Sequence, residues 1–213
     1  MNYSMIFFII GWVFLIEAAL MAPSALVALL YAEQSIWAFA AAIGLCLLLG
    51  VPLVRRQPAN KVFYAKEGCV TVALSWIVMS LMGALPFVFS GVIPSIVDAM
   101  FETVSGFTTT GASILKDVEV LPRCMLFWRS FTHWIGGMGI LVFILAILPM
   151  AGDYNMHIMR AESPGPSVGK LVPKIRITAK LLYSIYFCMT IVMMILLLLG
   201  KMPLFDSICM SFG

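Results

Sequence analysis

The sequence predicts an all-α integral membrane protein, built from helix–loop–helix units with a re-entrant loop that follow two leading transmembrane helices. Of its 213 residues, 62% are hydrophobic and only 11% are charged, whereas soluble domains carry about 25% charged residues. A polar, glycine-bearing segment, SGFTTTGASIL at residues 105–115, interrupts this apolar background. The residues just before that segment have a second copy near residue 206. Composition, polar segment and repeat together predict this fold class.

Five apolar runs are long enough to cross the hydrocarbon core, which takes about 20 residues each. They lie at residues 5–30, 35–54, 69–90, 125–149 and 178–199. The first run is too long for the apolar region of a signal peptide and no Lys or Arg precedes it, so we expect a membrane helix that the mature protein retains. Glu17 interrupts this run, and we expect a buried, hydrogen-bonded carboxyl there.

Basic residues fix the expected orientation. Most of them fall in two loops, after the second and the fourth span: Arg55, Arg56, Lys61 and Lys66, then Arg160, Lys170, Lys174, Arg176 and Lys180. Short loops rich in Lys and Arg face the cytoplasm, so we expect a cytoplasmic N-terminus and an outer location for residues 91–124. That outer segment is apolar but too short to cross and return, which predicts a re-entrant loop. The net charge of +3 gives no indication of nucleic-acid binding.

The re-entrant segment has the pattern of a short helix followed by an ion-binding loop. Ser95 and Asp98 have capping-box spacing, which predicts a helix over about 96–106. The extended backbone that follows cannot satisfy its own carbonyls, and at membrane depth such backbone lies against protein or a watery cavity. Backbone carbonyls replace the hydration shell of potassium in channel filters. We therefore expect a selectivity filter at Thr108, Thr109, Thr110, Gly111 and Ala112, with K⁺ at Thr109 and Thr110; an ordinary outer loop is the alternative.

Three charged residues are expected to support this loop: Asp98, Glu102 and Arg129. Arg129 is costly if it faces lipid, so we expect it to pair with a partner such as Glu102. Asp98, Glu102, Asp117 and Glu119 lie near the outer mouth, where they either concentrate cations or only cap and solvate the loop. The glycines of WIGGMG, residues 134–139, favour close helix packing over a gating hinge.

The internal repeat pairs IPSIVDAMFETVS, around Asp98, with MPLFDSICMSFG, around Asp206. The same spacing would start a second filter at position 216, beyond Gly213. The expected organisation is therefore two leading helices with a cytoplasmic loop (residues 1–67), a first helix–pore-loop–helix unit (68–150), a cytoplasmic linker (151–177) and the start of a second unit (178–213) that ends before its filter.

Two motifs carry a resemblance to a known family. FETVSGFTTTGAS, followed by FWRSFTHWIGGMGILVFILAILP, resembles the Trk/Ktr/HKT superfamily of potassium transporters, most closely the bacterial Trk-type membrane subunit. The resemblance runs through essentially the whole chain and implies its N-terminal place in a subunit of four pore-loop units. It implies potassium uptake, with K⁺ as the transported ion and no covalent cofactor. It also implies homodimers in the lipid of the bacterial cytoplasmic membrane and a cytoplasmic nucleotide-binding regulatory subunit.

Two other functions compete with a Trk-type transporter. A homotetrameric cation channel would need only one complete pore loop in each chain, but the second copy and the two leading helices argue against it. A membrane-embedded hydrolase could use Ser130 and His133, yet no acid or second base accompanies them on the nearly apolar spans. We therefore expect a transporter and not an enzyme.

Overall fold

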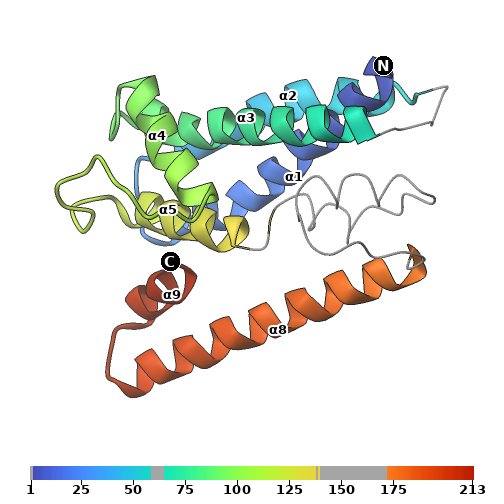
Figure 1. The fold of residues 1–213 in the computed structure, drawn as a ribbon. Coiled ribbons are helices and arrows are strands. Elements are labelled where there is room, and N and C mark those ends of the chain that lie inside the picture. The colour runs from blue at the N-terminus through green and yellow to red at the C-terminus, as the bar shows by residue number, and fades with distance from the viewer. Residues whose placement is uncertain (1, 59–64, 138, 140–171) are drawn as a thin grey trace.

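The computed structural model describes residues 2–58, 65–137, 139 and 172–213. All regular structure in these ranges is helical (Figure 1). The helices are α1 (Tyr3–Leu30), α2 (Ile36–Arg55), α3 (Ala65–Phe89), α4 (Ile96–Phe107), α5 (Arg123–Gly136), α8 (Val172–Leu199) and α9 (Leu204–Phe212). The predicted all-α fold class is confirmed.

Four described helices are long and apolar enough to span a membrane: Tyr3–Leu30, Ile36–Arg55, Lys66–Phe89 and Leu181–Leu199. They match the first, second, third and fifth predicted spans. The fourth predicted span, residues 125–149, begins in α5, but this α-helix ends at Gly136. Most of the remaining predicted span, and the linker up to residue 171, lies outside the described residues.

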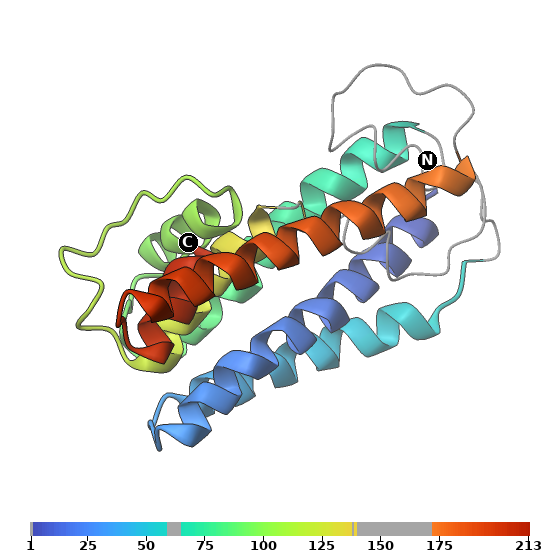
Figure 2. The ribbon, with the colours of Figure 1, turned by 90° about the horizontal axis from the view of Figure 1, so that it is seen from below.

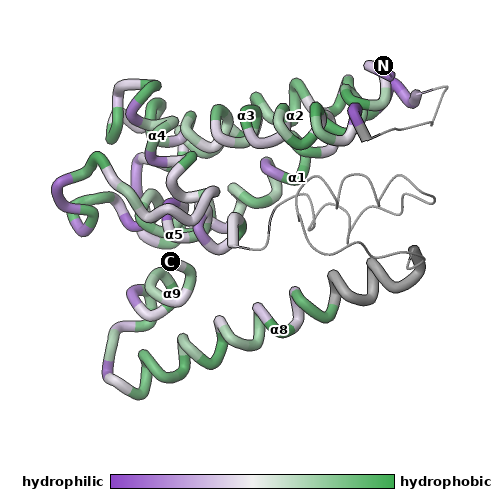
Figure 3. The backbone as a smooth tube through the Cα atoms, viewed as in Figure 1, coloured by the Kyte–Doolittle hydropathy of each residue, from purple (hydrophilic) through white to green (hydrophobic). Residues whose placement is uncertain are grey.

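Long and short helices occupy different parts of the molecule. Helices α1, α2, α3 and α8 run along its long direction, whereas α4, α5 and α9 gather at one end, away from the N-terminus (Figures 1 and 2). Hydrophobic residues dominate the long helices, and hydrophilic residues are frequent in the loop between α4 and α5 and near the N-terminus (Figure 3). Among the described residues, one of the polar segments therefore lies at the end where the short helices meet.

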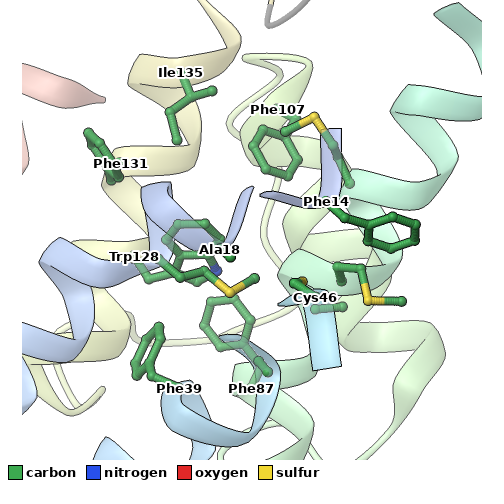
Figure 4. Close-up of a cluster of buried hydrophobic side chains, with 14 of the residues drawn as sticks. Phe14, Ala18, Phe39, Cys46, Phe87, Phe107, Trp128, Phe131 and Ile135 are labelled. Atoms are coloured by element: carbon green, nitrogen blue, oxygen red, sulfur yellow. The ribbon is translucent and has the colours of Figure 1, made fainter. Parts of the chain in front are cut away.

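The buried core combines the two leading helices, α1 and α2, with α3, α4 and α5. Side chains from α1 to α5 interdigitate in one cluster, and Trp128 of α5 lies fully buried between Phe39 of α2 and Phe107 of α4 (Figure 4). The Trp128 indole N–H donates a hydrogen bond to the carbonyl of Gly83 in α3 (2.9 Å). Because all five helices share this core, the leading helices form the scaffold behind α4.

Glu17 lies in the middle of α1 and is fully buried, as expected. The expected hydrogen bond is not present: neither carboxyl oxygen has a hydrogen-bond partner among the described residues. A side chain added at Gly83 would come within 3.4 Å of one of these oxygens. The carboxyl therefore lies against the backbone surface of α3, which offers a packing contact but no donor.

Candidate functional site

The short helix α4 begins where the sequence predicts it. Ser95 has extended backbone angles, and its hydroxyl accepts a hydrogen bond from the Asp98 N–H (3.4 Å), which satisfies one of the free donors in the first turn. Asp98 is exposed in that turn, where its carboxylate complements the positive end of the helix dipole. At 1.5 Å per residue α4 is about 18 Å long, shorter than the hydrocarbon core of about 30 Å. It can enter a membrane but cannot cross it.

The threonines after α4 end the helix in a strained turn. The N–H of Thr109 donates to the carbonyl of Gly106, and the N–H of Thr110 donates to that of Ser105, both at 2.9 Å. These two bonds form a Schellman motif, which places Thr109 at φ +55°. Glycine normally takes this left-handed position, and a β-branched residue there is an outlier. Such strain persists where the surroundings enforce it and is common at functional sites.

The hand of the backbone alternates along the loop. Thr109 (φ +55°) and Gly111 (φ +74°) have left-handed backbone, whereas Thr110 between them does not. Carbonyls alternate in direction along a regular strand, so an alternation of hand allows neighbouring carbonyls to face the same side. A row of carbonyls on one side is the arrangement that coordinates an unhydrated cation.

Side-chain hydroxyls of the described residues donate hydrogen bonds to the backbone carbonyls at both ends of residues 108–112, but not to those in the middle. The Ser105 hydroxyl donates to the carbonyl of Ala112 (2.6 Å), and the Thr109 hydroxyl donates to the carbonyl of Thr108 (2.7 Å). Among the described residues, nothing donates to the carbonyls of Thr109, Thr110 or Gly111. Residues 108–112 are exposed in this chain. Within residues 108–112, three successive backbone carbonyls therefore lack a hydrogen-bond donor from the described residues and lie at the exposed surface.

Glu102 joins α4 to two neighbouring segments. Its carboxylate accepts hydrogen bonds from the Arg129 guanidinium on α5, from the Ser113 hydroxyl (3.0 and 3.1 Å) and from the Ile114 N–H (3.2 Å). Only 1% of the Glu102 side chain is exposed, against 15% for Arg129. The expected pair of Glu102 with Arg129 is confirmed. The same carboxylate also anchors the segment that leaves the loop, which the sequence analysis did not predict.

Two glycines let α5 approach the C-terminal end of α4. A Cβ at Gly136 would overlap the carbonyl oxygen of Phe107 and lie 2.6 Å from its carbonyl carbon. A Cβ at Gly106 would overlap the Thr132 hydroxyl and lie 3.0 Å from the Thr132 Cβ. The expectation of close packing at Gly136 is confirmed. The end of α4, where the loop starts, is seated directly on the backbone of α5.

The glycine-rich segment also ends α5. Gly139 has φ +66°, and its N–H donates to the carbonyl of Gly136 (3.0 Å). Tyr186 of α8 donates its hydroxyl hydrogen to the carbonyl of Trp134 (3.1 Å), and Tyr183 donates to that of Gly139 (3.2 Å). Hydroxyls from α8 therefore satisfy carbonyls at the end of α5. The predicted span 125–149 is therefore interrupted at this point, because a glycine in left-handed backbone cannot continue an α-helix.

Helix α9 is the structural counterpart of α4. It is a short helix that begins after Pro203 and carries Asp206 in its first turn, as α4 carries Asp98. A cavity of about 850 Å³ lies between α9, the loop and α5; its lining includes Thr109, Gly111 and Asp206. Helix α9, helix α5 and the loop that follows α4 thus line a shared open space.

Within the part of the chain that the structure describes, no acid forms a hydrogen bond with Ser130 or His133. The His133 ring nitrogen Nδ1 lies 3.0 Å from the carbonyl of Arg129 on its own helix. Among the described residues, no group of three His, Cys, Asp or Glu side chains could hold a metal ion. The contact of His133 is therefore local to α5, and the structure gives the hydrolase alternative no support.

Long apolar spans, a short helix and a strained loop define an all-α protein of the multi-pass membrane class. Residues 35–208 match the family described as TrkH, Cation transport protein. The chain belongs to this family, which confirms the resemblance carried by the two motifs.

Similar proteins agree with this assignment. The chain is 36% identical to the Trk system potassium uptake protein TrkH of Halomonas elongata and 39% identical to that of Escherichia coli K12, in both cases over 100% of this chain and 45% of the relative. The crystal structure of the potassium transporter TrkH from Vibrio parahaemolyticus matches with a TM-score of 0.79 and 34% identity, over 100% of this chain and 42% of that one. The chain spans a little under half the length of the curated relatives it matches. The relatives' names point to a transporter rather than an enzyme.

Proposed function

We propose that this chain forms part of a Trk-type transporter that takes up potassium through a backbone-carbonyl filter at residues 108–112. The single observation that carries the proposal is the row of free carbonyls at Thr109, Thr110 and Gly111, at the end of a helix too short to cross the membrane. Thr109 and Thr110 are the proposed K⁺ ligands, and Thr108 and Ala112 close the segment at either end. Glu102, paired with Arg129, holds the segment that follows the filter, at Ser113 and Ile114, and Asp98 stabilises the start of α4.

The proposal includes an assembly around one axis. A potassium filter takes carbonyls from about four loops; α4 carries one, and we assign α9 to the start of a second unit. We propose the same four segments as above: two leading helices with a cytoplasmic loop (residues 1–67), a first helix–pore-loop–helix unit (68–150), a cytoplasmic linker (151–177) and the start of a second unit (178–213). The partners that fit a Trk-type subunit are a second copy of the subunit and a cytoplasmic nucleotide-binding regulatory subunit.

The proposed location is the bacterial cytoplasmic membrane, with the N-terminus in the cytoplasm. Basic residues such as Arg55 and Lys66 support this orientation. The N-terminus lies at the opposite end of the molecule from the proposed filter, as an outward-facing filter requires (Figure 1). The exposed apolar surface of α8 suits contact with lipid or further helices.

Rubidium provides the direct test, because it replaces potassium and scatters X-rays anomalously. Crystals of the full-length protein in rubidium are expected to show anomalous density beside the carbonyl oxygens of Thr109, Thr110 and Gly111. The same protein should restore growth at low potassium to a host that lacks potassium uptake. Growth without any bound ion at this loop would show that the filter is elsewhere; absence of uptake would contradict the transport function.

The pair of Glu102 and Arg129 gives a prediction that depends on the hydrogen bonds described above. Glu102→Arg or Arg129→Glu alone is expected to abolish rubidium uptake, because breaking a buried pair costs about 3–5 kcal/mol. The double reversal should recover part of the uptake. It should remain below wild type, since arginine at position 102 cannot accept from Ser113 and Ile114.

Uptake in the potassium-deficient host, normalised to the amount of protein in the membrane, measures this effect. Lys116→Glu, an exposed charge reversal on the same outer loop, serves as the control and should leave uptake unchanged. A double reversal no better than the single changes would show that the pair does not act as a unit.

A further inference from the structure

The turn between α1 and α2 has a strained conformation that no part of the proposed ion path explains. The N–H of Ala32 donates to the carbonyl of Leu29 (3.2 Å), and the N–H of Glu33 donates to that of Ala28 (2.9 Å). This Schellman motif places Ala32 at φ +51°, a position that glycine would take with less strain. The tight turn fixes the directions of the two flanking side chains, Tyr31 and Glu33.

Glu33 caps the distant helix α5. The N-cap of α5 is Pro122, which provides no side-chain hydrogen bond. The two carboxylate oxygens of Glu33 instead accept from the N–H groups of Arg123 (2.8 Å) and Cys124 (3.1 Å), across about ninety positions of the chain. A carboxylate at this place satisfies free N–H groups and complements the helix dipole. The start of α5 is therefore fixed to the leading helices.

Tyr31 extends the same connection to α9. The Arg123 guanidinium lies over the Tyr31 ring, 4.3 Å from its centroid, and 5.8 Å from the centroid of the Phe205 ring. The Tyr31 and Phe205 rings meet edge to face, with centroids 5.8 Å apart. A guanidinium over a ring face is a favourable cation–π contact, and an edge-to-face arrangement is favourable for two aromatic rings. The cluster joins the end of α1, the start of α5 and the start of α9.

The contact at Tyr31 complements a second attachment at the other end of α9. Phe212, the last residue of α9, packs against the rings of Phe127, Phe131 and Trp134 of α5. The middle of α9 is packed as well, since Ser207 and Cys209 are buried. The contact at Phe205 adds an attachment of the start of α9 to the leading helices, so the orientation of α9 relative to α5, and through α5 relative to α4, depends in part on them.

We propose that Tyr31, Arg123 and Phe205 form an outer clamp by which the leading helices position the second re-entrant unit relative to the first, and so contribute to ion selection. The inference rests on the proposed function. A filter discriminates between cations by the spacing and field of carbonyls from several loops. A tilt of α9 moves one of these loops relative to the others. The clamp residues are positioning residues, because none of them provides a ligand of the proposed filter.

The test is a double-mutant cycle in the full-length protein. Tyr31→Leu and Phe205→Leu are each expected to raise the KM for rubidium and to lower the preference for rubidium over sodium several-fold, with Vmax per transporter little changed. Tyr31→Phe keeps the ring and should retain wild-type selectivity. The double Leu variant should resemble either single variant, because two residues that act through one contact are not additive.

Leu30→Ala is the matched control, since Leu30 is 80% exposed on the same turn and should behave as wild type. Tyr31 is itself 42% exposed, so its replacement should leave the core intact; equal amounts of wild type and variant in the membrane check this. Wild-type selectivity in Tyr31→Leu, or additive effects in the double variant, would overturn the clamp. A wild-type protein without rubidium uptake would instead overturn the proposed function.

Discussion

Replacement of Gly111 by aspartate is expected to reduce rubidium uptake by the full-length protein to the background of the uptake-deficient host. Gly111 has φ +74°, and an L side chain there costs about 1–3 kcal/mol of strain. Relief of this strain requires rotation of the peptide groups of the loop, which would displace the carbonyls of Thr110 and Gly111 from the positions proposed to bind the ion. The aspartate also adds a carboxylate beside the ion path, where it would hold a cation too tightly to release it.

Gly91 offers an unusually close control for this experiment. It lies in the turn before α4 with φ +73°, and, as at Gly111, a Cβ there would meet no atom within 4 Å. Gly91→Asp therefore imposes the same backbone strain outside the proposed filter. We expect this variant to retain uptake even if its thermal stability falls. Equal loss of uptake in both variants would mean that strain alone explains the effect, and normal growth of the Gly111 variant at low potassium would contradict the filter assignment.

Gly136→Ala is expected to have the second largest effect, although this residue lies away from the loop. A methyl group at Gly136 would overlap the backbone carbonyl of Phe107, which cannot rotate away as a side chain can. Overpacking a tight contact costs about 1–3 kcal/mol. The end of α4 must move, and with it Thr108 and Thr109. We expect a melting temperature several degrees lower and at least a tenfold loss of rubidium uptake.

Alanine substitutions at two other glycines distinguish a specific clash at Gly136 from a general effect of replacing glycine by alanine. Gly44→Ala in α2 meets no atom within 4 Å and should leave both measurements unchanged. Gly137→Ala meets the Tyr186 hydroxyl at 2.5 Å, the far end of a side chain that can move, so a smaller loss is expected. If Gly136→Ala took up rubidium as well as Gly44→Ala, the contact between Gly136 and the end of α4 would not need to be as close as it is for uptake.

Local signals in the sequence predicted the bounds of the short helix α4 accurately. A helix over 96–106 was expected, and α4 runs from Ile96 to Phe107. Its start depends on a serine three residues before an aspartate, and its end on the glycine and threonines that follow, all within a few positions of the chain. The pair of Glu102 with Arg129 was also predictable, because an arginine within a predicted membrane span requires an acid and few acids are near.

Features that depend on contacts between distant segments could not be predicted. Nothing in three successive threonines indicates that the middle one takes left-handed backbone. The capping of α5 by Glu33 joins positions about ninety residues apart. The lack of a partner for Glu17 reflects the particular face of α3 that packs against it. In each case the outcome was decided by packing, whereas the sequence pattern constrains only neighbours along the chain.

The central place of α1 in the shared core has a consequence for how the protein is made. Chains leave the ribosome from the N-terminus, so α1, α2 and α3 can enter the bilayer before α4 emerges. The surface of α3 that contacts Phe107 and Thr103, at Trp76 and Gly83, is then already in place when the short helix arrives, whereas the contact of Phe107 with Gly136 of α5 forms later. Synthesis of the same units in another order, as in a circular permutation, would require α4 to wait at the bilayer surface for its scaffold.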